Sequence, residues 1–176
     1  MAPANVHHRH KGRGTHFVDY LPLMVIVALT LLSAFAKEAS HEAWNGTRWM
    51  QNFMGFFLVV FSMFKFFDLS GFADGFQMYD LLAKPFRPYA YVYPFIELGL
   101  GLSYLAHLAP ATTYGVTIVV MLWGAAGVVH ALMKGLDLEC ACMGTVLKVP
   151  LSTVALLEDL GMAGMAAAML IMGKMA

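Results

Sequence analysis

The sequence contains little charge. Only 12% of its 176 residues are Asp, Glu, Lys or Arg, whereas 60% are hydrophobic, and a soluble domain carries about twice this share of charge. Such a composition suits a lipid rather than an aqueous environment, and it excludes intrinsic disorder. The formal net charge is zero, which gives no basis for binding nucleic acid. We therefore expect an all-α membrane protein whose main partner is the lipid bilayer.

Cysteine is also scarce, because the chain has only Cys140 and Cys142. Two cysteines cannot form the disulfide framework of a small secreted domain. The sequence also has no nucleotide-binding glycine loop, no zinc-hydrolase motif and no recognisable nucleophile motif. Among enzymatic activities, the sequence leaves thiol–disulfide oxidoreductase chemistry at the two cysteines as a possibility.

Long apolar runs dominate the rest of the chain. A basic, His-rich tail at 1–19 precedes a first run at 20–36, which could resemble a signal peptide but is long enough to stay as a transmembrane helix. Residues 50–173 then form a four-helix membrane core that includes a segment at 69–84 and a loop at 135–150. The five predicted spans are 20–36, 50–67, 89–108, 114–133 and 152–172.

The segment 69–84 differs in kind from the spans. Its aromatic residues Phe72, Phe76 and Tyr79 are interleaved with polar ones at helical spacing. This pattern predicts an amphipathic helix that lies in the membrane interface, and Pro85 is expected to end it.

Lys and Arg are divided unequally between the two sides that five spans would create. Eight lie at the N-terminal tail, around 65–87 and beside the 135–150 loop, and three lie on the other side. The positive-inside rule then puts the N-terminus and the cysteine loop in the cytoplasm of a bacterial inner membrane. On that reducing side a permanent disulfide is not expected.

The cysteine pair is the most reactive feature of the sequence. Two thiols one residue apart can close a strained disulfide that is easily reduced. Cys140, Cys142 and the thioether of Met143 could instead bind a soft ion such as copper(I) or mercury(II). Inert packing of both thiols is the third alternative.

Several polar residues interrupt the predicted spans. Lys65 and Glu97 could neutralise one another, whereas Glu158 and Asp159 could accept protons during thiol chemistry or attract a cation, because intramembrane charges face the interior. His130 lies near a span end, where it is either an interfacial residue or a ligand.

Four stretches of sequence are distinctive: Phe53-Met54-Gly55-Phe56-Phe57 through Phe64-Lys65-Phe66-Phe67, Gly71-Phe72-Ala73-Asp74-Gly75-Phe76-Gln77-Met78-Tyr79-Asp80, Tyr93-Pro94-Phe95-Ile96-Glu97-Leu98-Gly99-Leu100-Gly101, and Cys140-Ala141-Cys142-Met143-Gly144. On these, the chain from Phe53 onward resembles the MauE/DoxX-like family of redox-associated inner-membrane proteins. The resemblance implies a four-helix core with a Cys-Gly-Cys-Phe-Gly loop. Here Ala141 and Met143 replace the Gly and Phe of that loop, and a helix is added at the N-terminus.

The resemblance implies thiol chemistry that serves maturation or transport of the small subunit of methylamine dehydrogenase. Our first hypothesis is therefore thiol–disulfide exchange between Cys140–Cys142 and a partner thiol protein or a quinone. The second is copper or mercury handling with a metallochaperone, in which Met143 helps to bind the ion and Glu97, Glu158 or His130 line its path. The third is an accessory structural subunit of a membrane complex or a homo-oligomer.

Overall fold

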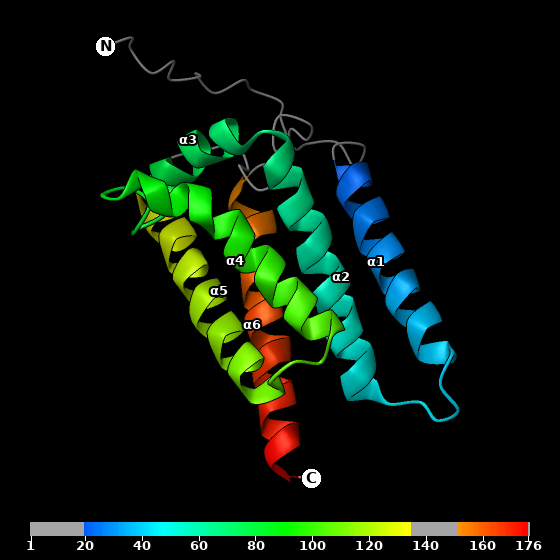
Figure 1. The fold of residues 1–176 in the computed structure, drawn as a ribbon. Coiled ribbons are helices and arrows are strands. Elements are labelled where there is room, and N and C mark those ends of the chain that lie inside the picture. Colours follow the sequence, from blue (N-terminus) through cyan, green and yellow to red (C-terminus); the bar gives the residue numbers. More distant parts are fainter. Residues whose placement is uncertain (1–19, 135–150, 176) are drawn as a thin grey trace.

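The computed structural model describes residues 20–134 and 151–175, and all the regular secondary structure in this part of the chain is helical. The prediction of an all-α membrane protein is thereby confirmed. The helices, drawn in Figure 1, are α1 (Leu21–Ala39), α2 (Gly46–Phe67), α3 (Leu69–Tyr79), α4 (Arg87–Leu105), α5 (Pro110–Met133) and α6 (Leu151–Met175).

Five helices run up and down the bundle, and the short α3 lies across one of its ends (Figure 1). We call this the α3 end. There α1 begins, α2 ends, α4 begins, α5 ends and α6 begins, so the C-terminal end of α6 lies at the opposite end. The most extensive packing joins α5 to α6, α2 to α4 and α1 to α2.

Four helices in the described part of the chain are long and apolar enough to cross a membrane. They are Leu21–Ala39, Gly46–Phe67, Pro110–Met133 and Ala155–Gly173, which makes the chain a multi-pass membrane protein. The remaining predicted span corresponds to α4, whose 19 residues extend about 28 Å at 1.5 Å per residue. This helix is less apolar because it contains Arg87, Glu97 and four tyrosines.

The connection between α1 and α2 is shorter than the gap of residues 37–49 between the first two predicted spans. The side chain of Asn45 accepts a hydrogen bond of 3.0 Å from the backbone of Arg48 and caps α2, so the helix starts at Gly46. The buried carboxylate of Glu38 also accepts hydrogen bonds from the Asn45 backbone and the Arg48 guanidinium. These contacts tie the two helix ends together.

The amphipathic helix was predicted to extend to residue 84, but α3 ends at Tyr79. The reason is the next residue: Oδ1 of Asp80 accepts hydrogen bonds of 2.9 and 2.7 Å from the backbone N–H groups of Leu82 and Ala83. A carboxylate that bonds to its own following backbone in this way forms a turn that competes with the helix. Pro85 is therefore not what ends α3.

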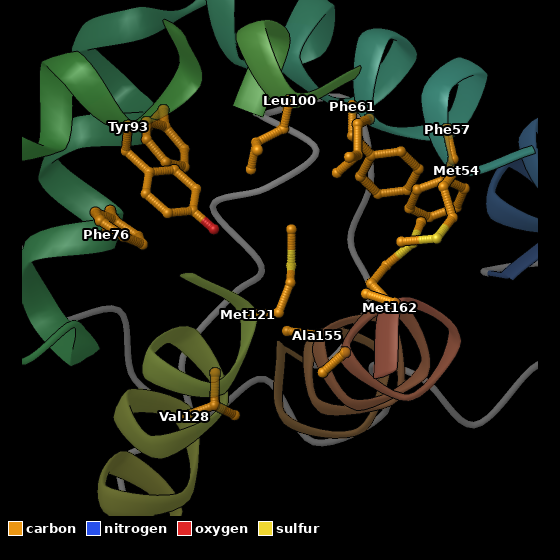
Figure 2. Packing of buried hydrophobic residues seen from close by; sticks show 14 of the residues in the cluster. Met54, Phe57, Phe61, Phe76, Tyr93, Leu100, Met121, Val128, Ala155 and Met162 are labelled. Atoms are coloured by element: carbon orange, nitrogen blue, oxygen red, sulfur yellow. The ribbon is translucent and has the colours of Figure 1, made fainter. Parts of the chain in front are cut away.

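The helices of the core approach closely where small residues meet. A Cβ added at Gly55 would lie 3.0 Å from the backbone oxygen of Gly101, and one added at Gly101 would lie 2.9 Å from Val59. Small residues allow such contact between membrane helices. Around this crossing the core is filled by large apolar side chains, among them Met54, Phe57, Phe61, Leu100, Met121 and Met162 (Figure 2).

Candidate functional site

A buried ion pair joins α2 to α4 near the α3 end. The ammonium of Lys65 donates a hydrogen bond to Oε2 of Glu97, and the two side chains are only 3% and 2% exposed. Each charge would be costly in an apolar bundle without the other. The mutual neutralisation considered from the sequence is thus what the structure contains.

Two further carboxyl groups from α6 adjoin this pair. Glu158 and Asp159 line the same small cavity as Lys65 and Glu97, with a volume of about 30 Å³, enough for about two water molecules. We call it the polar cavity. Its lining consists of Lys65, Phe72, Phe76, Tyr79, Tyr93, Glu97, Gly124, Val128, Ala155, Glu158 and Asp159. The cavity therefore brings together all four intramembrane charges that the sequence singled out.

Glycines on α5 make room for this arrangement. A Cβ at Gly124 would lie 2.8 Å from Oδ2 of Asp159, so any larger residue would displace the carboxyl group. One turn further along, a Cβ at Gly127 would lie 3.0 Å from the backbone oxygen of Tyr79. The second glycine thus lets the end of α3 pack directly against α5.

Aromatic rings form the other walls of the polar cavity. Phe72, Phe76 and Tyr79 come from α3. The rings of Phe72 and Phe76 pack with Tyr93 of α4 at centroid distances of 6.2 and 4.7 Å, and Tyr79 packs edge-on against Phe76 at 5.5 Å. The sequence pattern had identified the apolar face of α3 as a face for lipid. In the structure these residues are buried inside the protein, so the same periodicity marks a face that covers the bundle.

Asp80 lies directly after α3. Its side chain is buried, and burial raises the pKa of its carboxyl group above the ordinary value. Oδ1 accepts the two backbone hydrogen bonds of the turn, whereas Oδ2 is buried without a partner among the described residues. The α3 end thus holds a further acid close to the polar cavity.

A second polar layer lies toward the opposite end of the bundle. Gln51 donates a hydrogen bond to the hydroxyl of Tyr114 and contacts Nδ1 of His107 at 2.8 Å, and the hydroxyl of Tyr104 donates one to Thr117 at 3.1 Å. Partial burial, with the nearby charges of Lys37 and Arg48, lowers the pKa of His107. This layer is neutral, in contrast to the polar cavity.

Of the other predicted site residues, the structure describes only His130. His130 is exposed on α5 and does not line the polar cavity. Cys140, Cys142 and Met143 lie outside the described residues. Among residues 20–134 and 151–175, no group of three or more His, Cys, Asp or Glu side chains is arranged to hold a metal ion.

An apolar groove runs beside the polar cavity. It lies between α1, α2 and α6, has a volume of about 380 Å³, and is lined by residues that include Val27, Phe57 and Met165. Glu158 lines both spaces. Its side chain therefore separates the charged interior from a groove that suits hydrocarbon.

The chain matches a known protein family. The family model described as methylamine utilisation protein MauE matches residues 43–172, a range that contains α2 to α5, most of α6 and the segment with both cysteines. No curated protein and no solved structure matches the chain. The match covers well over half of the sequence and includes every residue of the polar cavity, and on this basis the chain belongs to the MauE family of methylamine-utilisation-associated membrane proteins.

Proposed function

We propose that this membrane protein carries out thiol–disulfide exchange through Cys140 and Cys142, in the maturation or transport of a partner protein of the type of the methylamine dehydrogenase small subunit. A thiolate of the partner attacks the Cys140–Cys142 disulfide and forms a mixed disulfide. The second partner thiol then releases the reduced pair. Two electrons and two protons pass from partner to pair, and the reverse reaction returns them, so the exchange balances without a further reagent.

The observation that carries the proposal is that the family match includes the cysteine segment. A further support is that α5 ends and α6 begins at the α3 end, near the polar cavity. Thiol exchange needs the thiolate form, which polar surroundings favour over an apolar core.

The experiment uses the fact that the chain has no third cysteine. In Cys142→Ser the remaining Cys140 cannot be released by its neighbour, so a mixed disulfide with the partner should accumulate and be seen on a non-reducing gel and by mass spectrometry. The matched control is the Cys140→Ser/Cys142→Ser double variant, which cannot form it. Absence of any adduct with Cys142→Ser, together with failure of the wild-type pair to form a disulfide in cells, would contradict the proposal.

Copper or mercury handling by the same residues is the second candidate function, and the thioether of Met143 beside the two thiols favours it. Purified wild-type protein should then contain close to one copper(I) or mercury(II) ion. That metal should disappear in the double serine variant, and it should weaken in Met143→Leu. Equal metal content in wild type and double variant would exclude this candidate.

We also propose that the N-terminus and the cysteine segment face the cytoplasm of the inner membrane. Lys65 is buried in the bundle and therefore no longer counts among the eight Lys and Arg residues on the cytoplasmic side. The remaining seven Lys and Arg residues, against three on the other side, still favour that orientation. A membrane-impermeant maleimide should label Cys140 and Cys142 in inverted vesicles and leave them unlabelled in intact spheroplasts. The opposite labelling pattern would refute this orientation.

A further inference from the structure

The polar cavity contains more carboxyl groups than cations among the described residues. In the part of the chain that the structure describes, three carboxyl groups, Glu97, Glu158 and Asp159, line it with one cation, Lys65, and that cation is already paired with Glu97. No residue in the described part of the chain donates a hydrogen bond to either α6 carboxyl group. Carboxylates in a membrane interior need a compensating positive charge or a proton.

The walls of the cavity are of a kind that attracts organic cations. The ammonium of Lys65 already lies 5.6 Å from the centroid of the Phe72 ring and 5.3 Å from that of Tyr93. Phe76 and Tyr79 add two more rings to the lining. Aromatic faces combined with carboxylates are how proteins recognise ammonium groups.

A hydroxyl group without a described partner points into this space. Tyr93 is only 6% exposed, and Figure 2 shows its hydroxyl directed away from α4 into the space between the helices. No described residue hydrogen-bonds to it. It can accept a hydrogen bond from an N–H donor, which makes it an acceptor in addition to the two α6 carboxyl groups.

We propose that the polar cavity binds a small ammonium ion, either ammonium itself or methylammonium. Glu158 and Asp159 would supply the countercharge, the hydroxyl of Tyr93 would accept one N–H hydrogen bond, and the aromatic rings would surround the rest. The volume of about 30 Å³ admits one or two non-hydrogen atoms, which fits ammonium or methylammonium and excludes larger amines. This proposal does not depend on the cysteines.

The test is infrared difference spectroscopy of the full chain in lipid bilayers, with ammonium chloride exchanged for sodium chloride at constant ionic strength and pH 7. Ammonium and methylammonium should each give a saturable change in the carboxylate and tyrosine bands, whereas tetramethylammonium should not. Glu158→Gln should weaken the apparent affinity at least tenfold. Tyr93→Phe keeps the ring but removes the acceptor, so it should abolish the tyrosine band and weaken binding severalfold.

Asp74→Asn is the matched control, because Asp74 is exposed, pairs with Arg87 at 2.5 Å and lies outside the cavity. It removes one carboxylate and should leave the difference spectrum unchanged. Three results would overturn the proposal. The first is no saturable spectral change with ammonium. The second is an equal spectral change when sodium replaces a bulky organic cation, and the third is a carboxylate change that only acidification produces. The last result would mean that the cavity stores a proton.

Discussion

Removal of Lys65 is expected to be the most damaging single change in the bundle. Lys65→Met leaves Glu97 buried without its partner and also removes a cation that lines the same cavity as Glu158 and Asp159. Breaking a buried ion pair from one side costs about 3–5 kcal/mol in free energy of unfolding. We expect a loss at the upper end of that range, because three carboxyl groups are affected. Glu97→Gln should cost less, since the ammonium keeps two other carboxyl groups within the same cavity.

The measurement is reversible unfolding in mixed micelles, followed by helical circular dichroism for the wild type, both single variants and the Lys65→Met/Glu97→Leu double variant. In an isolated ion pair, replacing both residues with apolar ones is nearly neutral. Here the double variant should recover only part of the loss, because Glu158 and Asp159 remain without a cation. A Lys65→Met variant within about 1 kcal/mol of wild type, or Glu97→Gln as the more damaging change, would refute this account of the cavity.

Two further changes test other parts of the bundle. Gly124→Ala puts a Cβ 2.8 Å from the Asp159 carboxyl group and should destabilise the protein by about 1–3 kcal/mol. The control is Gly115→Ala, where nothing lies within 4 Å, and this change should be neutral or stabilising by up to about 1 kcal/mol. Equal effects of the two substitutions on the free energy of unfolding would contradict the packing argument. Because the pKa of His107 is lowered in the folded protein, stability should be constant above about pH 7.5 and fall as pH drops through the unfolded-state pKa near 6.5. His107→Gln should flatten that dependence in unfolding curves between pH 5 and 8, and an unchanged slope would exclude His107 as its source.

The membrane character and the helices could be predicted because hydropathy and turn residues are local properties of the sequence. The boundaries were less accurate, since they depend on individual side chains that bond to nearby backbone. Asn45 starts α2 earlier than its apolar residues suggest, and Asp80 ends α3 earlier than Pro85 would. Such contacts follow from residue types that favour caps and turns, but the sequence does not say which of many Asn and Asp residues will be used.

The charged residues of the candidate site could be predicted from the sequence, but its aromatic walls could not. Lys65, Glu97, Glu158 and Asp159 are conspicuous because charge is rare in the spans, and their common cavity follows from the rule that such charges face inward. The aromatic walls were not predictable, because an amphipathic helix has the same pattern whether its apolar face meets lipid or protein. Only the tertiary packing of α3 across the bundle end distinguishes the two.

The polar cavity takes its lining from α2, α3, α4, α5 and α6, and this has a consequence for biosynthesis. Helices enter the membrane in chain order, so α2 and α4 are available to pair long before α6 is made. Lys65 and Glu97 neutralise one another within that early α2–α4 unit, which can therefore wait in the bilayer without an uncompensated charge. The α6 carboxyl groups arrive last. A chain truncated before Leu151 should still insert its α2–α4 pair, whereas the finished cavity forms only when translation is complete.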